Sequence, residues 1–276
     1  MLVPFPHRHA HQGQGGTTEL KVRGIGAAIT VTMRICTIPK LEQFPYWHID
    51  LNAGSGYNHE AGCIGSPLAF LNAAEKVGKK NYRAFFCDIN RAAISELRST
   101  LLGNPRCSCI HENNRVLLPE ISRLIRARES NPHFAMGTVL CDPNGYFYGD
   151  AVPAEELYQF CREFPRIDVI LNLNVTIRRW IRGNIAARRR GWEDKRCLRV
   201  DELPDFLNRK HWLIRDLASK GGHQFTVMVG RNHKMDDHQA MHFHHLHARQ
   251  GRNIVAQVET ADVQEALFSA RGEVTA

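Results

Sequence analysis

The chain has 276 residues, of which 43% are hydrophobic and 8% aromatic, and its formal net charge is +8. This composition supports a substantial core and excludes an intrinsically disordered chain, and no apolar run approaches the roughly 20 residues that span a bilayer. The length suits one large α/β domain or two small ones, and the positive charge raises the prospect of a polyanionic partner without deciding it.

Residues 1–42 are expected to form an N-terminal extension that is partly flexible, with the folded domain running from 43 to 276. The segment begins rich in His, Gly and Pro and then passes through a weakly apolar stretch, IGAAITVTMRICTIP. Its start lacks the long apolar stretch of a secretory signal. The eight cysteines include no Cys-x-x-Cys pair, which disfavours a zinc site or a disulfide framework. These features predict a reduced, cytoplasmic protein.

From residue 46 onward, strand patterns and helix patterns alternate. The predicted strands are 47–53, 82–90, 107–113, 133–143 and 167–175, and the helices between them are 66–77, 91–102, 115–128 and 154–164. Helices at 176–190 and 203–220 follow, and then two last strands at 224–231 and 253–259 that flank a His-rich insertion. This order predicts one doubly wound α/β domain with a seven-stranded, mostly parallel sheet that ends in an antiparallel hairpin.

Acids and glycines mark the ends of the first two predicted strands. The first strand carries Asp50 and leads into the Gly-Ser-Gly turn at 54–56, and the second strand ends in Asp88. Glycines allow a ligand to approach the backbone closely, and the helix that follows presents free N–H groups. An acid at the end of the second strand can accept hydrogen bonds from both hydroxyls of a ribose.

The next two strands also end in polar residues. The third ends in Glu112 and Asn113, which could recognise an adenine edge, and the fourth in Asp-Pro-Asn-Gly at 142–145. Any one of these ends could be an ordinary turn. Four polar ends around one crevice instead favour a nucleoside cofactor, because ligands of such sheets bind at the carboxyl ends of the strands.

The first turn helps to choose among nucleoside cofactors. It lacks the Gly-Lys-Ser/Thr ending of a phosphate-binding loop, and no third glycine follows at dinucleotide spacing. S-adenosylmethionine therefore fits better than a nucleotide. Two alternatives remain open at this point, namely an NAD-dependent oxidoreductase and a nuclease that holds a metal with Asp88 and Asp142.

Several stretches also resemble a known family. DLNAGSG, DIN and DPNG are similar to motifs of class I S-adenosylmethionine-dependent methyltransferases, which have a Rossmann-like sheet. More narrowly, the chain resembles the three-Cys-motif partner proteins over residues 46–259. The matching pieces are HIDLNAGSG, GSPLAFLNAAEK, FFCDIN, LCDPNGYF, IDVILNLNVTIRRWI and MHFHHLHARQGRNIV.

The resemblance implies roles for individual residues. Asp50 and the two glycines of the turn would lie against the methionine part of the cofactor. Asp88 would hold the ribose, and Glu112 with Asn113 would contact the adenine. The implied catalytic residues are Asp142, Pro143 and Asn144. The implied cofactor-binding residues are Asp50, Asn52, Gly54, Gly56, Asp88, Glu112 and Asn113.

The fourth strand end departs from the pattern of amino-directed DNA methyltransferases. Those enzymes carry Asp/Asn-Pro-Pro-aromatic at this place, whereas this chain has Asn144 for the second proline and Gly145 for the aromatic residue. The acceptor atom therefore stays open. No Pro-Cys nucleophile follows the strand, which disfavours methylation of cytosine C5. A base inside a duplex would have to be flipped out to reach the site.

A basic stretch and a His-rich stretch complete the candidates. The predicted helix 176–190 has no acid between its basic residues, and these could bind phosphates around Trp180 or form a solvated face; they are Arg178, Arg179, Arg182, Arg188, Arg189 and Arg190. The segment 233–247 holds six histidines, which favour a surface loop over a metal site.

The sequence thus predicts an S-adenosylmethionine-dependent methyltransferase that acts on nucleic acid, with DNA favoured over RNA, with no metal and no membrane association. One rival is a non-catalytic methyltransferase-like protein that works with a protein partner. The other is a metal-dependent nuclease on the same sheet. The oligomeric state is left open.

Overall fold

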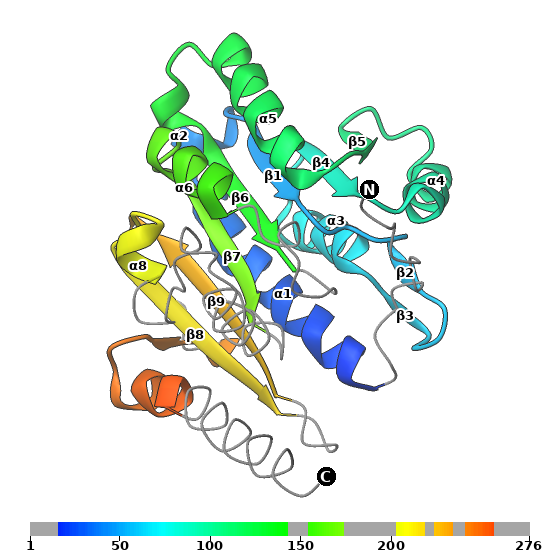
Figure 1. Ribbon diagram of the computed structural model, residues 1–276. Helices are drawn as coiled ribbons and strands as arrows, with labels where there is room; N and C mark the ends of the chain where they lie inside the picture. The colour runs from blue at the N-terminus through cyan, green and yellow to red at the C-terminus, as the bar shows by residue number, and fades with distance from the viewer. Residues whose placement is uncertain (1–15, 143–153, 174–202, 219–223, 234–240, 257–276) are drawn as a thin grey trace, which may run out of the picture.

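An eight-stranded sheet organises the chain in a computed structural model that describes residues 16–142, 154–173, 203–218, 224–233 and 241–256. The strand order is β10-β8-β9-β7-β6-β1-β4-β5, and all of these strands except β10 are labelled in Figure 1. Five of these strands are mutually parallel: β1 (Tyr46–Asp50), β4 (Tyr82–Asp88), β5 (Cys107–His111), β6 (Met136–Cys141) and β7 (Ile167–Leu173). The predicted doubly wound, mostly parallel sheet is confirmed.

Antiparallel strands extend the sheet beyond β7. β9 (Gln224–Arg231) pairs with both β7 and β8 (His211–Ala218), and the short β10 (His244–His245) pairs with β8. A separate two-stranded sheet consists of β2 (Tyr57–Asn58) and β3 (Cys63–Ile64). The sheet therefore has eight strands where seven were predicted.

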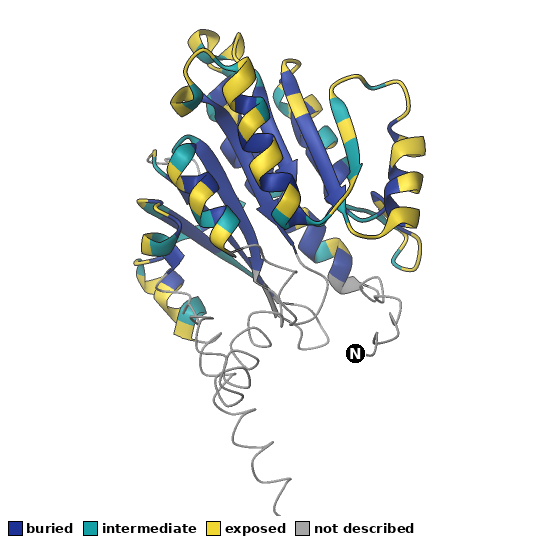
Figure 2. Ribbon diagram, turned by 45° about the horizontal axis from the view of Figure 1, so that its top comes forward, coloured by how far each residue is buried: buried dark blue, intermediate teal, exposed yellow. Residues whose placement is uncertain are grey.

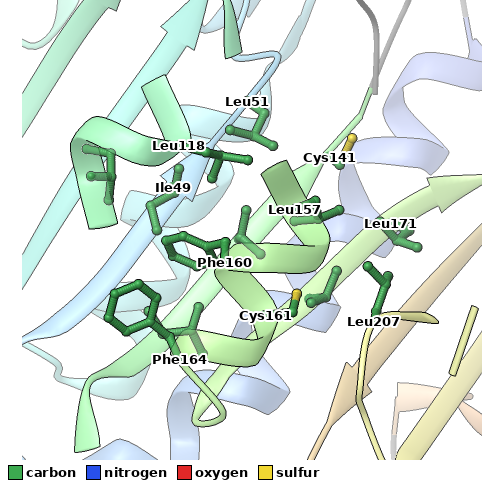
Figure 3. Packing of buried hydrophobic residues seen from close by; sticks show 14 of the residues in the cluster. Ile49, Leu51, Leu118, Cys141, Leu157, Phe160, Cys161, Phe164, Leu171 and Leu207 are labelled. Atoms are coloured by element: carbon green, nitrogen blue, oxygen red, sulfur yellow. The ribbon is translucent and has the colours of Figure 1, made fainter. Parts of the chain in front are cut away.

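Helices cover both faces of the sheet. On one face lie α5 (Asn114–Arg128) and α6 (Ala154–Glu163); their apolar residues pack with alternate residues of β1, including Ile49 (Figure 3). On the other face lie α1 (Gly16–Arg34), α3 (Ser66–Val77) and α4 (Arg91–Thr100), packed around Phe70 and Phe86. The strands are buried between these layers, whereas the outer sides of the helices are exposed (Figure 2). The shorter elements are η1 (Ile35–Thr37), α2 (Pro39–Glu42), η2 (Pro132–Phe134) and α8 (Leu203–Phe206).

The helix α1 lies in the stretch expected to be an N-terminal extension. Its apolar residues recur every three or four positions, and Ile25, Ile29 and Met33 are fully buried on the side that faces the sheet. Glycine allows a close approach to β8, because a Cβ at Gly24 would lie 2.4 Å from Leu217 Cδ1. The described part of this stretch is therefore part of the core, while residues 1–15 lie outside the described residues.

Two predictions at the C-terminal end are wrong. The predicted helix 203–220 is helical only at α8, after which β8 runs antiparallel to β9 along its whole length. Trp212 and Ile214 pack into one core cluster and Leu213 into the other, so both sides of β8 are buried. The predicted strand 253–259 is also wrong where it is described, because residues 249–256 are helical. The antiparallel hairpin beside β7 is consequently formed by β8 and β9, and β10 lies at the edge of the sheet.

Candidate active site

The carboxyl ends of β1, β4 and β6 meet at the point where the strand order reverses. β1 lies between β4 and β6 and is parallel to both, with Asp50 level with Phe86 on one side and Leu140 on the other. In open α/β sheets this switch point leaves a crevice outside the carboxyl ends, because the connections on either side run in opposite directions. Candidate residues at the ends of these three strands are therefore brought together.

Asp50 is the most deeply buried acid of this crevice. It is 0% exposed, and its Oδ1 accepts a hydrogen bond of 3.1 Å from the backbone N–H of Asn52. Its Oδ2 is buried and has no hydrogen-bond partner among the described residues. Burial is the main cause that raises the pKa of Asp50 to about 7; hydrogen bonds from the side chain of Ser66 and the backbone of Asn52 oppose the increase, and the charges of Asp142 and Asp88 add to it. A buried acceptor without a partner is costly, so this atom suits a ligand that donates a hydrogen bond or carries positive charge.

The glycine turn and Asp88 are joined directly. The backbone N–H of Gly54 donates to Asp88 Oδ2 at 2.9 Å, and that of Asn90 donates to Oδ1 at 2.8 Å. Gly54 and Gly56 have φ of +62° and +80°, a region that favours glycine. A Cβ at Gly54 would meet nothing within 4 Å, whereas one at Gly56 would lie 2.6 Å from Leu97 Cδ1. Gly54 therefore faces open space, whereas Gly56 is favoured by its positive φ and by its close contact with Leu97.

Asp142 is held at the end of β6 by three segments. Its backbone N–H donates to Asn52 Oδ1 at 3.2 Å, and its Oδ1 accepts from Asn172 Nδ2 at 2.7 Å. Its Oδ2 lies 3.0 Å from Lys21 Nζ of α1, in an ion pair whose two side chains are 6% and 9% exposed. Neither Lys21 nor Asn172 was predicted from the sequence as a site residue. Asn172 could have been found as a polar residue in the apolar run of β7, but nothing near Lys21 in the sequence marks it.

The end of β5 differs from expectation in detail. Asn113 is the N-cap of α5, because its Oδ1 accepts from the backbone N–H of Arg115 at 2.9 Å. Glu112 is exposed, and its Oε1 accepts from the backbone N–H of Asn113. The side-chain oxygen of Asn113 is therefore engaged in capping α5. Ile89, which directly follows Asp88, is 68% exposed and offers an apolar surface at this edge that was not predicted from the sequence.

Other predicted site residues lie outside the described residues, namely Pro143, Asn144, Arg178, Arg179, Arg182, Arg188, Arg189 and Arg190, together with the predicted helix 176–190. Of the histidines, His244 and His245 form β10, and His238 is not described. Within the described ranges, no group of three or more His, Cys, Asp or Glu residues could hold a metal ion. In those same ranges no helix is long and apolar enough to cross a membrane.

A separate cavity of about 110 Å³ lies at the opposite, amino ends of the strands. Its lining includes Asp168 and Arg231, which form a buried ion pair of 3.0 Å. Burial raises the pKa of Asp168 to about 6, although the adjacent guanidinium of Arg231 opposes the increase. This cavity is remote from the crevice because β7 begins where its lining is and ends at the carboxyl edge.

Comparisons with known proteins give no family assignment. No protein-family model matches the chain. A search of curated proteins found no match either. Among solved structures, a protein of Legionella pneumophila is 10% identical, with 90% of this chain and 93% of that chain covered and a TM-score of 0.49.

Two further solved structures are described as methyltransferases. An S-adenosylmethionine-dependent methyltransferase of Agrobacterium tumefaciens is 11% identical, with 81% of this chain and 64% of that chain covered and a TM-score of 0.43. The N-methyltransferase NodS of Bradyrhizobium japonicum is 8% identical, with 78% and 98% covered and a TM-score of 0.42. What the site of the present chain can do must follow from its own side chains.

Proposed function

We propose that this protein is a class I S-adenosylmethionine-dependent methyltransferase that acts on nucleic acid, with DNA favoured over RNA. The observation that carries the proposal is the linked carboxyl edge, where Asp88 binds the turn after β1 and Asp142 binds Asn52 of the same turn. Three strand ends are thereby linked around the buried carboxylate of Asp50. The motif resemblance to the three-Cys-motif partner proteins supports the same proposal.

The residues of the crevice fit this cofactor. Asp50 places a buried carboxylate at the end of β1, and the backbone at Gly54 faces open space that a ligand could occupy. Asp88 keeps lone pairs that can accept hydrogen bonds from ribose hydroxyls. Exposed Ile89 offers an apolar surface for a flat base. When bound, S-adenosylmethionine supplies a reactive methyl group on a sulfonium.

Asp142 would bind and orient the group that accepts the methyl. Its carboxylate is fixed in direction by Asn172 and Lys21, so it can orient an acceptor group without reorganising. The chain would then contribute proximity and orientation more than acid–base chemistry. The net charge of +8 and the acid-free run of arginines in 178–190 support a polyanionic acceptor.

A thermal-shift panel tests the proposal against its rivals. The panel contains S-adenosylmethionine, its demethylated product, NAD and divalent metals, because a ligand that binds only the native state raises the melting temperature. Stabilisation by the first two is expected. Stabilisation by NAD alone would favour an oxidoreductase, and by metals alone a nuclease.

Methyl transfer is tested separately with radiolabelled cofactor and a mixture of DNA, RNA and protein acceptors. Incorporation into DNA is expected, and incorporation into RNA alone would correct the favoured substrate. Cofactor binding without incorporation into any acceptor would favour the non-catalytic methyltransferase-like protein that works with a partner.

A further inference from the structure

The buried ammonium of Lys21 lies beside Asp142, the acid that is proposed to bind the methyl acceptor. Lys21 Nζ is 3.0 Å from Asp142 Oδ2, and the side chains of both residues are more than nine-tenths buried. Lys21 comes from α1, whose apolar side is fixed in the core by Ile25 and Ile29. The ammonium is therefore held beside Asp142 by a helix that is fixed in the core, just as the acids are held in place by the strands.

The position of Asp142 is set from other directions as well. Asn172 of β7 donates to its Oδ1, and Asn52 accepts from its backbone N–H. Its carboxylate therefore cannot turn away from Lys21 without losing the hydrogen bond to Asn172. The ion pair is a built part of the crevice, unlike a surface contact between two long side chains.

The ion pair between Lys21 and Asp142 determines which chemical groups can approach Asp142 as methyl acceptors. A buried lone carboxylate would attract an ammonium group, but the charge of Asp142 is already balanced by Lys21. An incoming ammonium would meet a like charge in a place where water screens poorly, which is strongly unfavourable. An uncharged N–H or O–H group meets no such repulsion and can still donate to the remaining lone pairs of the carboxylate.

We propose that Lys21 is a specificity-determining residue that restricts the acceptor to an uncharged group, such as the exocyclic amino group of a nucleobase, and excludes alkylammonium groups. The inference rests on the proposed methyltransferase function. In the transfer, the lone pair of the uncharged acceptor nitrogen forms the new N–C bond. The C–S bond of the sulfonium breaks with its electron pair on sulfur, and the N–H proton of the acceptor leaves to water. An ammonium has no lone pair for this step.

The test compares four proteins on two kinds of acceptor. Wild type, Lys21→Met, Lys21→Arg and the control Lys76→Met, an exposed lysine of α3, are given radiolabelled S-adenosylmethionine with either DNA or spermine. Wild type, Lys21→Arg and Lys76→Met should use DNA at least about tenfold better than spermine. In Lys21→Met the ratio of spermine to DNA methylation should rise by at least about tenfold. Because the overall positive charge repels spermine similarly in both Met variants, a change in Lys21→Met alone isolates the local pair.

The outcomes separate this inference from the proposed function. Wild type that prefers spermine, or Lys21→Met with an unchanged acceptor ratio, overturns the inference while methyl transfer itself stands. Wild type that binds no cofactor in calorimetry overturns both. If Lys21→Met does not fold, wild type and Lys21→Arg still test the inference, because both keep a cation at this position and both should prefer DNA over spermine. The absence of that preference in either protein contradicts the role given to the cation.

Discussion

At the scale of single residues, Asp88 has a double task at the end of β4. It accepts a hydrogen bond from Gly54 in the turn after β1, and it is the proposed hydrogen-bond acceptor for the ribose hydroxyls of the cofactor. Replacing Asp88 by Ala should weaken cofactor binding by about 2–4 kcal/mol, since hydrogen bonds to a charged acceptor are lost. Calorimetry measures this loss, with Glu75→Ala on the exposed side of α3 as the control. Unchanged affinity in a folded Asp88→Ala variant would remove Asp88 from the cofactor site.

Asp142 shows why the choice of substitution matters. Asp142→Ala removes the carboxylate that lies 3.0 Å from the buried ammonium of Lys21, which should reduce the free energy of unfolding by roughly 3–5 kcal/mol. The double variant Asp142→Ala, Lys21→Met removes both charges and should recover most of that stability. Urea denaturation measures both effects. Equal stability of the single and the double variant would contradict this recovery.

Asp50 should make stability depend on pH. Its folded-state pKa of about 7 lies above the ordinary value of 3.8, so the folded chain holds the proton more tightly than the unfolded chain. The stability that this group contributes is therefore fully present below about pH 4 and is lost as pH rises through about 7, at up to about 1.4 kcal/mol per pH unit.

Asp50→Asn isolates this contribution, because an amide does not titrate in this range. The difference in free energy of unfolding between wild type and Asp50→Asn, measured in urea at about pH 5 and about pH 8, should shift in favour of the variant at the higher pH. A difference that stays constant with pH would mean that the carboxyl group ionises in the folded state as it does in the unfolded state.

At the scale of elements, Lys79 connects the N-terminal helices to β1. Its buried ammonium donates to the backbone carbonyls of Cys36, Glu42 and Phe44, each at 3.0 Å. Lys79→Met should lower the free energy of unfolding by roughly 2–4 kcal/mol, because the carbonyl groups lose a charged donor in a buried place. Lys80→Met is the neighbouring exposed control, and it should change stability little. Similar urea midpoints for the two variants would contradict this role.

The helix α1 gives the second element-scale prediction. Ile29 is fully buried between α1 and the sheet, so Ile29→Ala should cost about 2–5 kcal/mol of stability. If residues up to 42 formed an extension outside the folded domain, the same substitution would leave the urea midpoint unchanged.

Elements were predictable where local pattern and tertiary environment agree. The helix predicted at 66–77 has the bounds of α3, with proline in its first turn and Gly78 in the left-handed conformation at its end. β8 was missed because it is buried on both sides, so its apolar run lacks the alternation that marks a strand. Only its pairing with β9 and β10 makes it a strand, and pairing between distant segments is not visible in a local pattern.

At the scale of the whole molecule, the sheet and the acids at its carboxyl edge were predictable because they follow from alternation and from strand ends. The contacts that shape the crevice were not. Lys21 reaches Asp142 only after α1 has packed across the sheet, and Asn113 caps α5 because of its backbone position. Local sequence can nominate side chains at strand ends, but their partners depend on how the layers pack.

Calorimetric titration of the wild-type chain with S-adenosylmethionine tests the central claim most directly. We expect saturable binding of one cofactor molecule per chain, in competition with the demethylated product, and a marked loss of affinity in Asp88→Ala. No binding by a folded wild-type chain would contradict the proposal that this crevice is a methyltransferase site.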